Sequence, residues 1–124
     1  MSTVGWQRLE GLLIAVAALL WLWGRGPGWP FWLWPLLFFA PDGSWLGYLF
    51  GPRVGALSYN AAHLYAGGAI LAGVGHVFGL AGLWTDLGLI WMAHVGYDRA
   101  LGYGLKEITG FADTHLGRIG RPAA

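Results

Sequence analysis

The sequence predicts an all-α integral membrane protein, built as a four-helix bundle with a short cytoplasmic C-terminal tail. Apolar residues make up 56% of the 124 residues and charged residues only 10%, whereas a soluble domain contains about 25% charged residues. Four stretches of about 20 mostly apolar residues follow one another with short connections, and each is long enough to cross a bilayer as a helix. The length suits one domain covering residues 1–124.

The first predicted span covers residues 5–23 and is followed by a breaker rich in glycine. Arg8 precedes its apolar core, as in a signal peptide, but Glu10 lies at its start. A Trp-Leu-Trp-Gly-Arg sequence also stands where small residues would be needed for cleavage. We therefore interpret this segment as a retained transmembrane helix.

The second predicted span covers residues 29–50 and contains Pro41 and Asp42 near its middle. Its first half alone is too short to cross a bilayer. Proline is tolerated in membrane helices where neighbouring groups satisfy the freed backbone atoms. The sequence thus predicts one helix kinked at Pro41.

The third and fourth predicted spans cover residues 55–79 and 80–101, and a polar tail covers 102–124. Small residues and the Gly75–Gly79 pair keep the third span thin, which favours close helix packing or, alternatively, an oligomer interface. Gly102 is expected to end the fourth helix.

The distribution of basic residues predicts the orientation, because short cytoplasmic loops are enriched in Lys and Arg. Six of the seven basic residues fall on one side of the predicted spans, and only Arg25 lies on the other. These six are Arg8, Arg53, Arg99, Lys106, Arg118 and Arg121. We therefore expect a bacterial inner-membrane protein with both termini in the cytoplasm.

Several functional classes are excluded or disfavoured by composition. The chain has no cysteine, which rules out disulfides, thiolate catalysis and cysteine-ligated metal. Its net charge of +1 and the lack of a basic run argue against a nucleic-acid partner. Membrane lipid is the partner that the composition favours.

Ionisable side chains lie at a common depth in all four predicted spans, roughly 5 to 12 Å from the cytoplasmic ends at 1.5 Å per helical residue. This layer contains Glu10, Asp42, His63, His94 and Asp98. Charged side chains within a bilayer cost about 2.5 to 3.5 kcal/mol when placed in lipid, so they are expected to face the bundle interior and one another.

The layer has the composition of a metal site. His94 and Asp98 are four residues apart and share a helix face. Imidazole and carboxylate are ligands of zinc and of non-haem iron or manganese. We predict Asp42, His63, His94 and Asp98 as ligands.

In this interpretation the bound ion would activate water for hydrolysis of a lipid-like ester or amide. The predicted general base or acid is Glu10 or Asp113. Asp113 belongs to the tail, which could fold onto the cytoplasmic mouth together with His115, or could lie at the membrane interface.

Two other interpretations fit the same residues. The layer could be a structural network in which Arg53 and Arg99 neutralise the carboxylates. It could also serve a non-enzymatic protein that carries ions or protons, or that holds haem between His63 and His94.

Several motifs together resemble an uncharacterised family of small bacterial integral membrane proteins, domain-of-unknown-function family 4260. They are Pro41-Asp42-Gly43-Ser44, Gly47-Tyr48-Leu49, Gly51-Pro52-Arg53-Val54-Gly55, Tyr59-Asn60 with His63, Trp91 with Ala93-His94, Gly96 with Asp98-Arg99, Gly102-Tyr103-Gly104-Leu105-Lys106, and Phe111 with Asp113-Thr114-His115-Leu116-Gly117. The resemblance covers nearly the whole chain and implies a four-helix membrane protein without supplying an activity.

A looser similarity links the polar layer to membrane hydrolases of the alkaline ceramidase type, which hold zinc with Ser, Asp and His in a helical bundle. This chain has fewer helices and lacks their closing H-x-x-x-H pair, for which His94 and Asp98 are the nearest substitute.

Overall fold

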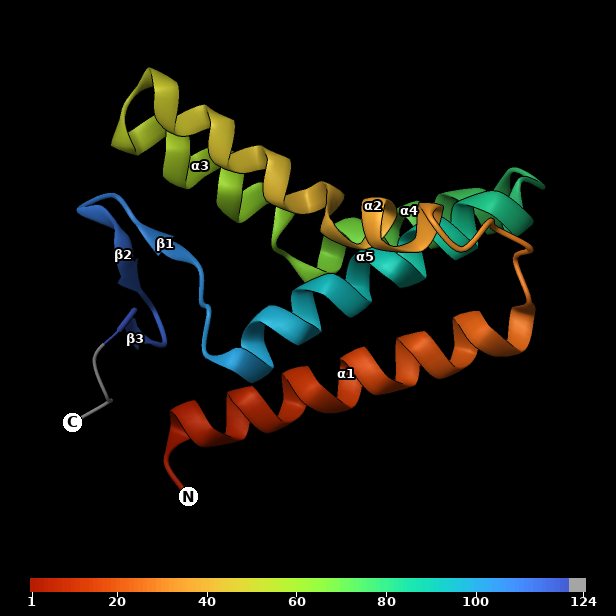
Figure 1. Cartoon of the computed structure of the whole chain (residues 1–124), viewed down its shortest axis with the longest axis horizontal. Coiled ribbons are helices and arrows are strands. Elements are labelled where there is room, and N and C mark those ends of the chain that lie inside the picture. The colour runs from red at the N-terminus through yellow and green to blue at the C-terminus, as the bar shows by residue number, and fades with distance from the viewer. Residues whose placement is uncertain (121–124) are drawn as a thin grey trace.

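The computed structural model describes residues 1–120, which form five α-helices, one 3-10 helix and a small sheet (Figure 1). The elements are α1 (Thr3–Arg25), α2 (Leu33–Phe39), η1 (Ala40–Phe50), α3 (Pro52–Ala62), α4 (Tyr65–Val77), α5 (Ala81–Leu101), β1 (Lys106–Glu107), β2 (Gly110–Thr114) and β3 (Gly117–Arg118). Arg121, counted above for orientation, lies outside the described residues.

Helices α1 and α5 run antiparallel along most of the molecule, with α4 packed against another side of α5 (Figure 1). The Ser2 hydroxyl caps α1 by accepting a hydrogen bond from the Gly5 N–H at 3.0 Å. Gly102 ends α5 with a φ of 92°, a left-handed conformation that glycine adopts without strain. The predicted glycine stop is therefore confirmed.

Arginine side chains fasten α1 to α5 at both ends. At one end Arg8 Nε donates to the Ala100 carbonyl at 3.0 Å. At the other end Arg25 Nε lies 2.5 Å from Asp86 Oδ1, and its Nη2 donates to the Gly82 carbonyl at 3.2 Å. The position of α1 along α5 is thus fixed by polar contacts as well as by packing.

Pairs of glycines allow the helices to touch α5 backbone to backbone. A Cβ on Gly96 of α5 would lie 2.5 Å from the Gly11 carbonyl oxygen of α1, and a Cβ on Gly68 of α4 would lie 2.5 Å from the Gly88 carbonyl oxygen of α5. Small residues at such crossings permit close packing in a membrane. At Gly68 the glycine-rich stretch of the third predicted span therefore packs against α5 of the same chain.

Alanine substitutions in α4 should have opposite effects on the free energy of unfolding. Gly68→Ala would force α4 away from α5 and should destabilise the protein by about 1 to 3 kcal/mol. A Cβ added at Gly73 would meet no packing neighbour within 4 Å, so Gly73→Ala should stabilise by up to about 1 kcal/mol through helix propensity. Unfolding in mixed detergent micelles measures both, and equal effects at the two sites would contradict this packing of α4.

The chain is mostly helical, as the sequence predicts, but two of the predicted spans are not single helices (Figure 1). The predicted helix over 29–50 is wrong as a kinked α-helix: α2 has only 7 residues, and from Ala40 the chain continues as an 11-residue 3-10 helix. Proline at position 41 removes a backbone donor, and the 3-10 form is longer per residue than the α-helix. Gly47 of η1 and Gly55 of α3 let these elements pack closely as a hairpin.

The predicted third span, 55–79, is also wrong as a continuous helix. It is broken into α3 and α4 at His63 and Leu64, where Leu64 has an extended backbone with φ −95° and ψ 139°. The prediction of an all-α four-helix bundle is corrected accordingly.

The tail forms a three-stranded antiparallel sheet in the order β1-β2-β3 rather than irregular chain. Its strands are short, and Gly117 turns the chain with a φ of 111°. In Figure 1 the sheet lies between α3 and the N-terminal end of α1, so that both ends of the described chain lie at one end of the molecule.

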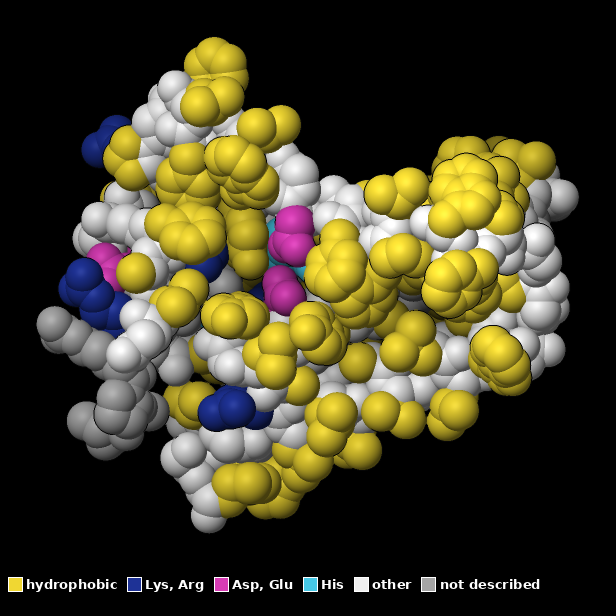
Figure 2. All heavy atoms as spheres, in the orientation of Figure 1, with side chains coloured by type: hydrophobic (Ala, Val, Ile, Leu, Met, Phe, Trp, Pro, Cys, Tyr) yellow, Lys and Arg dark blue, Asp and Glu magenta, His cyan; other side chains and the backbone are white. Residues whose placement is uncertain are grey.

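Among the described residues only α1 is both long and apolar enough to pass as a membrane span. Such a helix near the N-terminus is compatible with a membrane span or with a signal sequence. The apolar surface is nevertheless wide: Figure 2 shows hydrophobic side chains over much of the viewed face. Trp23, Phe31, Phe50 and Val77 are each more than 70% exposed.

Candidate metal centre

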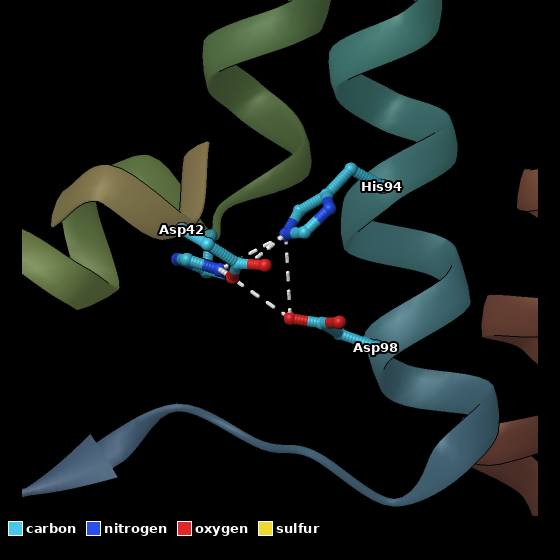
Figure 3. A group of neighbouring side chains, drawn as sticks. Asp42, His94 and Asp98 are labelled. Carbon is cyan, nitrogen blue, oxygen red and sulfur yellow. Dashed lines mark hydrogen bonds and ion pairs between the residues drawn. The ribbon is translucent and has the colours of Figure 1, made fainter. Parts of the chain in front are cut away.

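Asp42, His63, His94 and Asp98 converge on one point, where one ligand atom from each lies within 4.8 Å of all the others. They come from η1, the end of α3, and two successive turns of α5. Figure 3 shows Asp42, His94 and Asp98 pointing toward one another. The predicted convergence of these four residues is confirmed.

His63 presents one defined nitrogen to the cluster. Its Nδ1 lies 2.7 Å from the Tyr59 carbonyl oxygen, which can only accept a hydrogen bond. Nδ1 therefore carries the proton, and the lone pair of the neutral ring lies on Nε2. The Tyr59 ring stacks on His63 at 3.7 Å between centroids with an 8° interplanar angle, which holds the imidazole in this orientation.

The same hydrogen bond explains why α3 ends at this point. In a continuing helix the His63 N–H would bond to the Tyr59 carbonyl. The His63 side chain occupies that carbonyl, and its own N–H bonds to the Asn60 carbonyl at 3.1 Å. The last turn of α3 therefore has a hydrogen bond between residues three apart, and the helix ends at His63.

Other carbonyls at the break are satisfied by side chains of α5. Trp91 Nε1 donates to the Ala62 carbonyl at 2.7 Å, and Arg99 Nη2 donates to the His63 carbonyl at 2.8 Å. Arg99 Nη1 also donates to the Tyr103 carbonyl at 2.9 Å. Helix ends buried away from water require such partners. Arg99 therefore supports the backbone and forms no ion pair with a carboxylate in the described part of the chain.

His94 is fully buried and directs Nε2 at the cluster, 3.2 Å from His63 Nε2. Phe38 and Phe39 pack edge-on against its ring. Its Nδ1 is buried without a hydrogen-bond partner among the described residues. Apolar walls thus hold this ring, and when Nε2 presents its lone pair the Nδ1–H of the neutral ring has no acceptor among the described residues.

The two carboxylates complete the cluster from opposite sides. Asp42 Oδ1 lies 3.2 Å from Nε2 of both histidines. Asp98 Oδ2 lies 3.3 Å from His63 Nε2 and 3.5 Å from His94 Nε2, and the Tyr59 hydroxyl donates to it at 3.4 Å. The Asp98 side chain is 9% exposed, whereas that of Asp42 is 43% exposed. The cluster is therefore closed on the histidine side and open at Asp42.

A cavity of about 650 Å³ lies on this open side. In Figure 2 acidic side chains and part of a histidine are visible at the bottom of a hollow surrounded by apolar side chains. The lining residues are Phe39, Asp42, Trp45, Tyr59, Tyr97, Asp98, Leu101, Tyr103, Lys106, Phe111 and Ile119. Both carboxylates thus face a space large enough for a small organic ligand.

Lys106 is a site residue that the sequence indicated only as a basic residue of the tail. Asn60 fixes its backbone by accepting from the Lys106 N–H at 2.6 Å and donating to its carbonyl at 2.9 Å. Burial lowers the pKa of the Lys106 ammonium, and the charges of Asp98 and Asp42 oppose this change. The sheet, which composition did not reveal, is what brings Lys106 to the cavity.

The other predicted site residues lie elsewhere. Glu10 is exposed on α1 and lines a separate surface groove with Trp6 and Leu13. Asp113 accepts a hydrogen bond from Thr109 and lies 3.8 Å from Arg118. His115 accepts from the Leu105 N–H and contacts Gln7 of α1 at 3.1 Å. The tail does cover the mouth of the cluster, but through Lys106 and Phe111.

The donor spacing fits one small cation. Ligand bonds of about 2.0 to 2.2 Å in a tetrahedral arrangement separate neighbouring donor atoms by about 3.3 to 3.6 Å. The five nitrogen–nitrogen and nitrogen–oxygen distances given above lie between 3.2 and 3.5 Å. Five of the six donor separations thus suit one small cation, and the sixth, between the two carboxylate oxygens, is within 4.8 Å.

Comparison with known proteins places the chain in a family. Residues 4–119 match the family described as Domain of unknown function (DUF4260), and the chain belongs to that family. No curated protein and no solved structure gives a match.

Proposed function

We propose that this member of the DUF4260 family is a membrane protein that binds a divalent metal ion at Asp42, His63, His94 and Asp98. We further propose that the ion serves hydrolysis of a lipid-like ester or amide in the adjoining cavity. The observation that carries the proposal is the convergence of four potential ligands at the base of an otherwise largely apolar cavity.

The geometry favours a metal ion over haem. Axial haem ligands lie on opposite faces of the porphyrin, so two histidines that share a haem must leave room for the ring between them. The two Nε2 atoms are 3.2 Å apart, which leaves no such room.

The arrangement also favours a metal ion over a purely structural network. A structural network needs only pairwise hydrogen bonds, whereas a metal site needs several donor atoms around one point, and here one ligand atom from each of the four residues lies within 4.8 Å of the others. Here the nitrogens of both rings and one oxygen of each carboxylate aim at one point, while the available arginine bonds backbone carbonyls instead. A divalent cation would neutralise both carboxylates at once.

Hydrolysis is supported by the open side of the cluster. Structural zinc sites are closed by four protein ligands, whereas catalytic sites keep a position for water and can expand to five ligands. With all four residues bound, the water would enter as a fifth ligand from the open side at Asp42. When bound, the ion would polarise a carbonyl and lower the pKa of a coordinated water to about 7. Asp42 Oδ1 faces the histidines, and its Oδ2 makes no hydrogen bond with the described residues, so we propose Oδ2 as the proton acceptor in place of Glu10 or Asp113.

A membrane location is supported by the apolar surface. Large exposed apolar patches mark interaction with lipid or with protein, and α1 has the length of a span. We propose a bacterial inner-membrane protein in which both ends of the chain face the cytoplasm, as the basic residues indicate. A reporter fused to the C-terminus tests this orientation, and an external reporter would overturn it.

Metal content and esterase activity test the proposal in one preparation. Protein purified in neutral detergent should bind about one zinc ion per chain by elemental analysis. It should cleave nitrophenyl esters of medium-length fatty acids, and dialysis against a chelator should abolish both properties. His76→Ala is a matched control, because His76 is exposed on α4. Stoichiometric zinc without esterase activity would overturn hydrolysis of this substrate class, and absence of binding would overturn the metal site itself.

A further inference from the structure

Lys106 places a cationic group in the wall of the cavity beside the cluster. The residue is only 4% exposed, and its Nζ lies 3.8 Å from the centroid of the Phe111 ring and 4.9 Å from that of Tyr59. It forms no ion pair with any carboxylate of residues 1–120. The two aromatic faces stabilise the ammonium in part. Within residues 1–120 the cation therefore has no direct ion pair, and the carboxylates of Asp98 and Asp42 act on it only from a longer distance.

Its position is fixed by the fold. The two hydrogen bonds between the Asn60 side chain and the Lys106 backbone join β1 to α3. Phe111 on β2 packs edge-on against Tyr48 and Tyr59, which holds the sheet over the cavity. The ammonium is therefore preorganised rather than attached to a mobile tail.

The charges of the loaded site do not balance. Before its water loses a proton, a divalent ion with two neutral imidazoles and the carboxylates of Asp42 and Asp98 has a net charge of zero. Lys106 then leaves the cavity with one positive charge. An uncompensated buried charge is costly, and an anionic group on a ligand would remove that cost.

The rest of the lining suits an apolar chain. Phe39, Trp45, Tyr97, Leu101 and Ile119 form most of the remaining wall. The volume of about 650 Å³ lies within the range typical of ligand sites, about 300 to 1,000 Å³. The cavity thus has charged groups at the metal-ligand cluster and at Lys106, and the rest of its wall is suited to a hydrocarbon chain.

We infer that the cavity binds an anionic amphiphile, with its carboxylate or phosphate group between Lys106 and the metal ion and its alkyl chain along the aromatic wall. The inference rests on the proposed function, since the charge count includes the bound ion. It gives the substrate or product of the site a chemical class: a single-chain anionic lipid.

Calorimetric titration of the zinc-loaded protein in neutral detergent tests this inference with three probes. Octyl phosphate has both the anionic group and the chain, octanol has only the chain, and inorganic phosphate has only the anion. Octyl phosphate should bind about tenfold or more tightly than either partial probe. Lys106→Met should lower its affinity about tenfold or more, the effect of losing a charge-assisted hydrogen bond, with zinc content and octanol affinity unchanged.

Two further variants distinguish a loss of the Lys106 charge from misfolding of the Lys106→Met protein. Lys106→Arg keeps the charge and should retain the preference for octyl phosphate, whereas Arg118→Met removes an exposed charge from the same sheet and should change nothing. A preference that survives in Lys106→Met, or equal binding of inorganic phosphate and octyl phosphate, would overturn the inference while leaving the metal site intact. Absence of zinc from the unmodified protein would instead overturn the proposed function together with the inference.

Discussion

Replacement of His94 by alanine should reduce bound zinc from about one ion per chain to a small fraction. Structural zinc sites gain about 10 to 16 kcal/mol from four ligands, or about 3 kcal/mol each, which corresponds to about a hundredfold in affinity. His94 is one of two nitrogen ligands and is fully buried, so no exposed group can take its place without rearrangement. Elemental analysis after gel filtration measures the loss.

The large-to-small change at His94 also leaves space in the core, so the fold of the variant must be tested separately. Asp98→Asn keeps the shape of the side chain and should also weaken zinc binding strongly. His76→Ala makes the same chemical change on an exposed surface of α4 and should keep the ion. Stoichiometric zinc in folded His94→Ala protein would show that the ion binds elsewhere.

The convergence of the four ligands could be predicted because it depends on simple constraints. The prediction kept ionisable side chains away from lipid and counted their positions along each predicted span at a fixed rise per residue. His94 and Asp98 share one face of α5 by their spacing alone, and Asp42 lies beside the proline that marks a break in its predicted span. The positions of these residues can therefore be estimated from local sequence patterns and helix length, without knowledge of tertiary contacts.

The break at His63 could not be predicted in this way, because no proline or glycine marks it. It depends on the His63 side chain taking a carbonyl from its own helix, and on Trp91 and Arg99 reaching it from another. These partners are 29 and 36 residues away in the sequence from the carbonyls that they satisfy. A continuous apolar segment therefore predicted one helix where tertiary hydrogen bonds produce two.

The contribution of the tail was missed for a related reason. Its strands have 2, 5 and 2 residues, too short for a clear alternation of polar and apolar positions. Its docking depends on Asn60, which no local sequence pattern connects to the tail. Asp113 and His115 looked like site residues by type, but β2 and the turn after it direct them to Thr109 and Gln7.

Replacement of Arg99 by methionine should destabilise the protein and weaken metal binding together. Arg99 is 6% exposed and donates to two backbone carbonyls, those of His63 and Tyr103. Hydrogen bonds from a charged donor contribute about 1.5 to 3 kcal/mol each. Because removal of the buried charge offsets part of this loss, we expect the free energy of unfolding to fall by about 2 to 4 kcal/mol.

The weaker metal binding would follow from the position of one bond. Arg99 Nη2 donates to the backbone carbonyl of His63, which is itself a predicted ligand. Without this hydrogen bond the segment between α3 and α4 would become more mobile, and His63 Nε2 could move away from the other ligands. Arg99→Lys keeps the charge but lacks the planar fork that reaches two carbonyls, and it should lie between the two forms in stability and zinc affinity. Arg53→Met, at an exposed position of α3, is the control for loss of an arginine. If Arg99→Met matched Arg53→Met in micellar unfolding and zinc titration, the helix break would not depend on this guanidinium, and the ligand geometry would have to be held by Tyr59 and Trp91 alone.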